Sequence, residues 1–121
     1  MRIFKSSWFA RFAFKEGITD DELREMVDQL EMGQADADLG GGVYKVRVAQ
    51  PGKSKAGGYR VIVFFRSEER TFFVYGFAKS RRANIDEKEL RGFKKDAKDQ
   101  LSLTDEKITA WLKSKRLTEV F

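Results

Sequence analysis

Residues 59–77 read Tyr-Arg-Val-Ile-Val-Phe-Phe-Arg-Ser-Glu-Glu-Arg-Thr-Phe-Phe-Val-Tyr-Gly-Phe, and this stretch decides the fold. β-Branched and aromatic residues lie on both sides of the polar segment 67–69, which is typical of two strands joined by a tight turn. The sequence therefore predicts strands over residues 59–66 and 70–77, paired as an antiparallel hairpin.

A third strand precedes this hairpin, because the side-chain period is two over residues 43–48. Its two faces alternate: Val43, Lys45 and Arg47 on one side, and Tyr44, Val46 and Val48 on the other. One face is apolar and the other carries cations, as expected for a half-buried antiparallel strand. A flexible basic loop over residues 50–58 joins it to the hairpin, so we predict a three-stranded meander.

Two helices are predicted ahead of the meander, after a short strand over residues 2–4. They cover about residues 7–15 and 20–30. The second helix begins with a capping box, in which the Thr19 hydroxyl and the Glu22 carboxylate satisfy first-turn amides. The apolar positions of the first helix are expected in the core, and they are Trp8, Phe9, Phe12 and Ala13.

The remainder of the chain is predicted to be helical. Asp86 caps a helix that runs to about Leu101, and Thr104 caps another that contains Ile108 and Leu112. The order of the predicted elements, with helices first, an antiparallel sheet next and helices last, indicates an α+β fold. We expect one domain over residues 1–121, built around one core, with two N-terminal helices, a small antiparallel sheet and C-terminal helices.

Residues 34–42 form a polar, glycine-rich connection between helix and strand. Asp36 and Asp38 lie two residues apart in it, but no further oxygen ligands follow nearby, so a metal site is not expected. We interpret this segment as turn and linker chemistry.

The composition excludes many kinds of site. The chain has 121 residues, with 24 Lys+Arg, 19 Asp+Glu, no His and no Cys. A disulfide framework, a Cys/His zinc site, a Ser-His-Asp triad and a cysteine nucleophile are therefore impossible. The apolar runs are too short for a membrane span, and no leader peptide is recognisable at the N-terminus. We expect a cytoplasmic protein that uses no metal, no small-molecule cofactor and no membrane.

The net charge of +5 is unevenly distributed. Residues 1–44 carry −4, residues 45–82 carry +8 and residues 83–121 carry +1. A positive charge of that density favours binding to a polyanion, because each neutralised phosphate releases counterions. The alternative is a solvated basic face without a partner.

The predicted meander gathers the cations of the central segment on one concave face that is short of acids. They are Lys45, Arg47, Lys53, Lys55, Arg60, Lys79, Arg81 and Arg82. Tyr44, Tyr59 and Tyr75 offer stacking surfaces, although strand tyrosines are commonly core residues. Such a face is a plausible cradle for RNA.

Cleavage of RNA through the 2′-hydroxyl needs a base, cations for the pentacovalent phosphate and an acid for the leaving oxygen. In a chain without histidine, a lysine among like charges can serve as the base. Arginines would bind the phosphate oxygens bidentately.

Three stretches resemble the RelE/ParE superfamily of bacterial toxins. They read Ala-Asp-Leu-Gly-Gly-Gly-Val-Tyr-Lys-Val-Arg-Val-Ala at 37–49, Gln-Pro-Gly-Lys-Ser-Lys-Ala-Gly-Gly-Tyr-Arg at 50–60, and Phe-Val-Tyr-Gly-Phe-Ala-Lys-Ser at 73–80. The Gly-Gly-Tyr-Arg segment is the most specific of these elements. The match covers essentially the whole chain and is closest to the RelE-like, HigB-related branch.

The resemblance implies a compact α+β fold with the two N-terminal helices packed on a small antiparallel sheet. It also implies the toxin of a type II toxin–antitoxin pair, held inactive by a cognate antitoxin protein. RelE-like members enter the ribosomal A site and cleave mRNA without a metal, which inhibits translation. Matched by motif, the functional cations of this mRNA interferase fall on Lys45, Arg47 and Arg60, and a fourth falls on Lys79 or the neighbouring Arg81 and Arg82. We take Lys79 as the fourth catalytic cation, and the expected RNA-binding cations are Lys53, Lys55, Arg81 and Arg82.

One position departs from the family pattern. RelE carries a catalytic tyrosine shortly after the last basic cluster, whereas residues 80–86 here contain none. The general base is therefore open: a lysine takes this role, or the ribosome supplies more of the catalysis. Two other functions also stay open, namely a ParE-like toxin that inhibits DNA gyrase and a basic RNA-binding module without activity.

Overall fold

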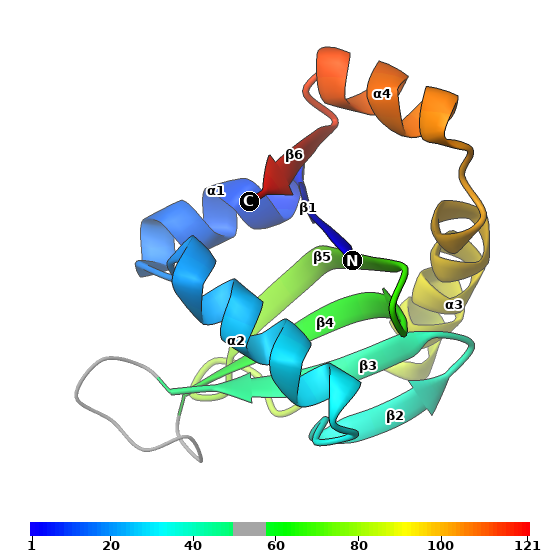
Figure 1. Cartoon of the computed structure of the whole chain (residues 1–121). Helices are drawn as coiled ribbons and strands as arrows, with labels where there is room; N and C mark the ends of the chain where they lie inside the picture. Colours follow the sequence, from blue (N-terminus) through cyan, green and yellow to red (C-terminus); the bar gives the residue numbers. More distant parts are fainter. Residues whose placement is uncertain (50–57) are drawn as a thin grey trace.

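The computed structural model describes residues 1–49 and 58–121 (Figure 1). The elements in chain order are β1 (Arg2–Ser6), α1 (Ser7–Glu16), α2 (Asp20–Glu31), β2 (Ala37–Gly40), β3 (Val43–Val48), β4 (Tyr59–Arg66), β5 (Arg70–Ala78), α3 (Glu87–Leu101), α4 (Asp105–Lys113) and β6 (Leu117–Val120). An α+β fold is thus confirmed. The predicted loop at 50–58 lies outside the described residues except for Gly58.

Strands β3, β4 and β5 form the antiparallel meander that the sequence predicts. The sheet is larger than expected, however, because the described strands form one sheet in the order β2-β3-β4-β5-β1-β6. Strand β1 pairs in parallel with β5, so the sheet is mixed rather than purely antiparallel. Two expectations were wrong: residues 34–42 contain β2, and the C-terminal segment is not wholly helical, because it ends in β6.

The helices cover the two faces of the sheet in separate pairs (Figure 1). On one face, α1 and α2 bury Phe9, Leu23 and Leu30 against the sheet. On the other face, α3 and α4 bury Leu101 and Ile108. The apolar interior is therefore two clusters on opposite faces and not the one core that was predicted.

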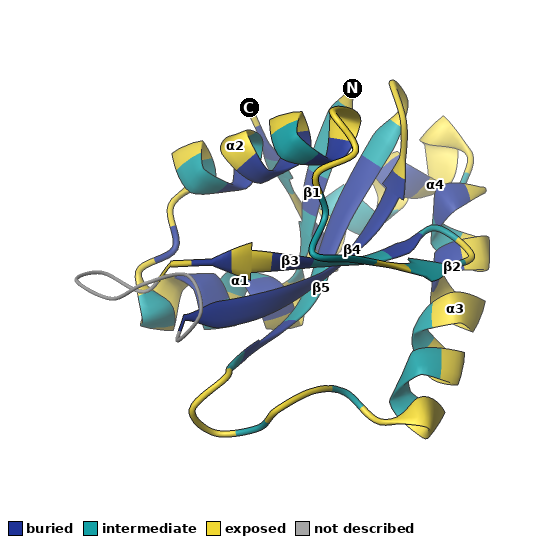
Figure 2. Cartoon of the chain, turned by 90° about the horizontal axis from the view of Figure 1, so that it is seen from below, coloured by how far each residue is buried: buried dark blue, intermediate teal, exposed yellow. Residues whose placement is uncertain are grey.

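Strand β4 runs through the middle of this arrangement, and all of its residues except Arg66 are buried (Figure 2). A strand covered on both faces reads as a near-continuous apolar run, which explains the Val-Ile-Val-Phe-Phe sequence at 61–65.

The predicted helix starts are confirmed. The Thr19 side chain accepts a hydrogen bond from the Glu22 backbone N–H, and the Glu22 carboxylate accepts one from the Thr19 backbone N–H, which makes a complete capping box. Asp86 and Glu89 make the same arrangement at the start of α3. Gly17 ends α1 with a φ of 73°, a left-handed conformation that glycine adopts without strain.

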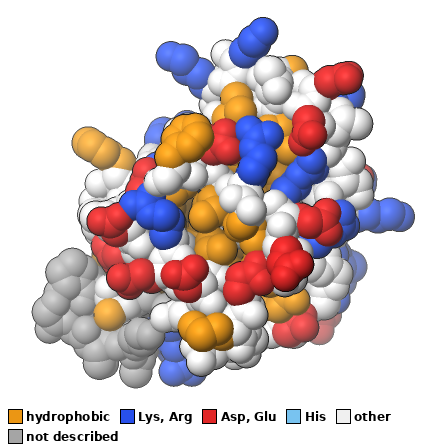
Figure 3. Space-filling model, in the orientation of Figure 1, with side chains coloured by type: hydrophobic (Ala, Val, Ile, Leu, Met, Phe, Trp, Pro, Cys, Tyr) orange, Lys and Arg blue, Asp and Glu red, His pale blue; other side chains and the backbone are white. Residues whose placement is uncertain are grey.

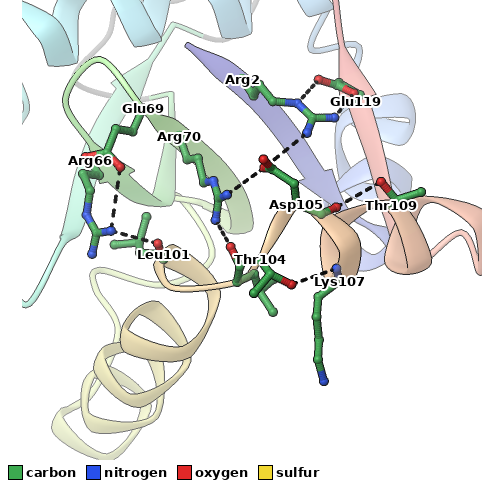
Figure 4. A network of polar contacts seen from close by, with 11 residues as sticks. Arg2, Arg66, Glu69, Arg70, Leu101, Thr104, Asp105, Lys107, Thr109 and Glu119 are labelled. Carbon is green, nitrogen blue, oxygen red and sulfur yellow. Dashed lines mark hydrogen bonds and ion pairs between the residues drawn. The ribbon is translucent and has the colours of Figure 1, made fainter.

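Two arginines of the basic central segment bind groups at the α3–α4 junction (Figure 4). The Arg66 guanidinium donates to the Leu101 carbonyl at 2.9 Å. Arg70 donates to the Leu103 carbonyl and lies 3.1 Å from an Asp105 carboxylate oxygen. Both lie at the opposite end of β4 and β5 from Arg60, so the +8 of the segment overstates the charge of any one surface.

The acidic N-terminal third is visible on the surface. Figure 3 shows a row of Asp and Glu side chains across the lower half of this face, where Figure 1 places α2. Within residues 1–49 and 58–121, no helix combines the length and apolar character that crossing a membrane requires.

Candidate nucleic-acid interface

The strand register brings three of the predicted cations together. Val43 belongs to the cluster on the α3 face, so Lys45 and Arg47, which alternate with it, lie on that face too. Arg47 pairs with Arg60 across β3 and β4. These three cations therefore lie together at the end of the strands that α3 and α4 do not cover.

Asp36 lies at the centre of these cations. Its Oδ1 is 2.6 Å from Arg47 Nε, and its Oδ2 is 3.9 Å from both Lys45 Nζ and Arg60 Nε. Because Ala37 pairs with Lys45 at the start of β2, that strand holds the preceding carboxylate beside β3. We call Asp36, Lys45, Arg47 and Arg60 the Asp36 cluster.

The Asp36 cluster corrects two expectations. The cationic face is not short of acids, because a carboxylate that is 14% exposed stands among its cations. Asp36 is also more than a turn residue, because it is the ion-pair partner of the cations on β3 and β4. Three cations around one carboxylate leave an excess of positive charge on a largely preformed anion-binding arrangement.

Burial differs among the three cations. The Arg47 side chain is half-exposed, whereas Arg60 is only 3% exposed. A guanidinium so buried must be paired and hydrogen-bonded, and Arg60 also donates to the Tyr59 carbonyl at 3.3 Å. Arg60 is thus fixed in direction, while Arg47 is the cation most open to a ligand.

A second group of polar contacts joins the segment between β5 and α3 to this face. Lys45 Nζ donates to Asn84 Oδ1 at 3.5 Å, and Arg82 Nε donates to the Asn84 carbonyl at 3.0 Å. Arg82 also binds the Glu89 carboxylate through two nitrogens and donates to the Tyr75 hydroxyl at 3.2 Å. These bonds anchor an otherwise mostly exposed segment beside the sheet (Figure 2).

The Arg82–Glu89 pair shifts the pKa of both partners. The hydrogen bond from Arg82, followed by the bond from the Asp86 backbone, lowers the pKa of Glu89 below its ordinary value. The same carboxylate raises the pKa of the Arg82 guanidinium. Both groups therefore stay charged at neutral pH, and the anchor of the segment is ionic.

The remaining predicted cations differ in position. Lys79 and Arg81 are exposed side chains that follow β5. The Lys79 backbone N–H donates to the Gly58 carbonyl at 3.1 Å, which places it at the same end of the sheet as Arg60. Lys53 and Lys55 lie outside the described residues.

The three tyrosines divide between the faces. Tyr44 and Tyr59 pack on the α1–α2 side, and the Tyr59 hydroxyl donates to Glu16 at 2.8 Å. They are therefore not stacking surfaces of the cationic face. Tyr75 packs on the α3 side, opposite Ile62, which itself pairs with Lys45.

Sequence reasoning missed Asp36, Asn84 and Glu89 as parts of this interface. Only the i, i+3 spacing of Asp86 and Glu89 carried a signal, and that signal was a helix cap. The role of Asp36 depends on β2, which the pattern did not predict.

One protein family matches almost the whole chain. Residues 1–120 match the family described as the RelE toxin of the RelE / RelB toxin-antitoxin system. The match spans almost the entire chain, from β1 to the end of β6, and it implies a cognate antitoxin as the partner. The chain belongs to the RelE toxin family and is the toxin component of a toxin–antitoxin system.

Proposed function

We propose that this toxin is a metal-independent, ribosome-dependent mRNA endoribonuclease whose scissile phosphate binds at the Asp36 cluster. The observation that carries the proposal is the convergence of Lys45, Arg47 and Arg60 on a single carboxylate group. A carboxylate and a phosphate oxygen attract the same donors, and arginine matches the geometry of both.

The reaction follows from these groups. The 2′-oxygen attacks the adjacent phosphorus, its proton passes to a base, and the bond from phosphorus to the 5′-oxygen breaks. The leaving 5′-oxygen takes up a proton, so the products are a 2′,3′-cyclic phosphate and a 5′-hydroxyl. The pentacovalent intermediate carries extra negative charge, so preoriented cations stabilise it more than they stabilise the substrate.

Each cation has a separate role in the proposal. Half-exposed Arg47 and the less exposed Lys45 contact the phosphate oxygens. Buried Arg60 adds positive charge behind them. Lys45 forms an ion pair with Asp36, and an ammonium group that pairs with a carboxylate can pair with a phosphate in the same way. The exposed Lys79 ammonium, at the same end of the sheet, stabilises the leaving 5′-oxygen. The base is a lysine of this face or a group of the ribosome, because the Asp36 carboxylate is already engaged by three cations.

The test is induced expression followed by mapping of mRNA 5′ ends. The wild-type protein should give cuts at defined positions within codons on translated messages. Lys45→Ala and Arg47→Ala should each reduce the cuts by about 10²-fold or more, the typical effect of losing one oxyanion-stabilising group. Lys98→Ala, an exposed cation on α3, is the matched control and should leave them unchanged.

Other outcomes would contradict the proposal. Growth arrest with intact mRNA and broken DNA would indicate gyrase inhibition of the ParE type. RNA binding without cleavage on translating ribosomes would indicate a binding module. Retained antitoxin binding by each variant shows that a loss of cutting does not come from unfolding.

A further inference from the structure

A cavity of about 410 Å³ lies between α1 and the end of β5, outside the Asp36 cluster. Its apolar lining includes the rings of Trp8, Phe12 and Phe77. Trp8 is 41% exposed, so the prediction that it is a core residue was wrong. Its ring stacks on Phe12 with centroids 5.4 Å apart and an interplanar angle of 14°. The cavity therefore offers a flat aromatic surface that the fold leaves partly uncovered.

The rim of this cavity is cationic. Arg11, Lys15, Arg81 and Arg82 line it, and Glu16 is the acid among its lining residues. The Glu16 carboxylate already accepts a hydrogen bond from the buried Tyr59 hydroxyl. Aromatic rings surrounded by cations are the combination that binds single-stranded nucleic acid, with bases stacked on the rings and phosphates on the cations.

The cavity is connected to the Asp36 cluster through contacts already described. Arg82 lines the cavity and binds the Asn84 carbonyl, while the Asn84 side chain accepts from Lys45. Tyr75, on the cationic face, contacts the Trp8 ring at a centroid distance of 4.7 Å. These contacts form a continuous series of residues from Lys45 to the cavity.

We propose that this cavity is a subsite for a nucleobase of the RNA strand, adjacent to the nucleotide that is cleaved. The inference rests on the proposed function, since it deepens the substrate recognition of the same enzyme. The volume lies within the range of small-ligand pockets. The base stacks on the aromatic lining, and Arg81 and Arg11 bind the flanking phosphates.

The experiment measures binding of a hexanucleotide whose 2′-hydroxyls are all replaced by hydrogen, so that it cannot be cleaved. Trp8→Ala should weaken its affinity by about 5- to 150-fold, the range for losing one stacked base. Phe14→Ala is the matched control, because Phe14 lies on the same helix, is 90% exposed and does not line the cavity. It should leave the affinity unchanged.

A second measurement uses Trp8 as the reporter, in a Trp111→Phe protein that retains no other tryptophan. The hexanucleotide should change the Trp8 fluorescence, and an abasic site at one of its positions should abolish the change while the strand still binds. Arg81→Ala, which removes an exposed side chain, tests the cationic rim if Trp8→Ala fails to fold. Its affinity should fall while Lys98→Ala retains the wild-type value.

Two results would overturn the subsite. The first is that Trp8→Ala and Arg81→Ala bind the hexanucleotide as tightly as the two control variants do. The second is Trp8 fluorescence that responds to the antitoxin but not to the hexanucleotide, since the cavity would then be a protein-binding site. Either result leaves the proposed function standing if Lys45→Ala abolishes mRNA cutting. If Lys45→Ala cuts as the wild type does, the proposed function fails on its own evidence.

Discussion

In the proposed function, Asp36 opposes RNA binding and supports RNA cleavage at the same time. Its negative charge repels a phosphate that approaches the cluster, and its ion pairs hold Arg47, Lys45 and Arg60 in one arrangement. A residue with both effects is a positioning residue. Its loss is expected to change the affinity for RNA and the rate of cleavage in opposite directions.

Asp36→Asn is expected to bind uncleavable RNA roughly 5-fold more tightly, since one nearby repulsive charge is removed. The same variant should cleave about 10²-fold more slowly, because the cations lose their common anchor and small misplacements are costly. Binding by anisotropy and single-turnover cleavage on ribosomes measure the two effects separately.

Asp38→Asn is the control for this pair of measurements. Asp38 is exposed and its carboxylate accepts from the Gly40 backbone N–H, away from the cluster. If Asp36→Asn changes affinity and rate in the same direction, Asp36 is a charge-neutralising residue and the positioning role is wrong.

At the scale of elements, the close approach of α1 to β5 depends on Gly76. A Cβ at this position would lie 2.4 Å from the Phe12 ring. Gly76→Ala should therefore destabilise the protein by about 1–3 kcal/mol, the usual cost of overpacking. Gly92→Ala on α3 meets open space and should instead stabilise it by roughly 0.5–1 kcal/mol. Urea unfolding of both variants checks the difference in sign.

The connection from β5 to α3 should be sensitive to acid through Glu89. Its pKa is lowered in the folded protein, so its ionised form stabilises the fold above the ordinary value of 4.5. That contribution is lost as the pH falls through the lowered pKa. The stability difference between wild type and Glu89→Gln should thus be largest near neutral pH and shrink in acid, as urea titrations at several pH values will show. A difference that grows in acid would contradict the ionic anchor.

The meander could be predicted because its signals are local. The alternation of apolar and polar side chains over residues 43–48 lies within one strand. The turn at 67–69 joins two strands that are neighbours in the sheet. Strand β1 was predicted, but its place in the sheet was not, since its neighbours are β5 and β6, far along the chain. Strand β2 has only four residues and ends in glycine, so no periodicity revealed it. The part of the site that depended on β2, namely Asp36, was missed for the same reason.

At the scale of the whole molecule, the cations of the central segment divide into two groups with different roles. Those of the Asp36 cluster face the proposed substrate, while Arg66 and Arg70 brace the α3–α4 junction at the far end of the sheet. The salt dependence of RNA binding separates these groups, because only contacts with phosphate release counterions.

Lys45→Ala should reduce the slope of log affinity against log salt by about 0.7, the value for one phosphate contact on a single strand. Arg66→Ala should leave that slope unchanged and lower the unfolding free energy instead, because Arg66 binds the end of α3. Anisotropy titrations at several salt concentrations, with urea unfolding alongside, test both statements. Equal slopes for wild type and Lys45→Ala would remove Lys45 from the phosphate-binding set.

The position of β1 between β5 and β6 has a consequence during synthesis. Strand β1 is made before both of its neighbours, and the Arg2–Glu119 hydrogen bonds join residues 117 positions apart. Pairings at such separation form late, after the loop-closure entropy has been overcome. The sheet of a nascent chain therefore stays incomplete until β6 has emerged, and both edges of β1 remain without their partner strands while the intervening helices are made.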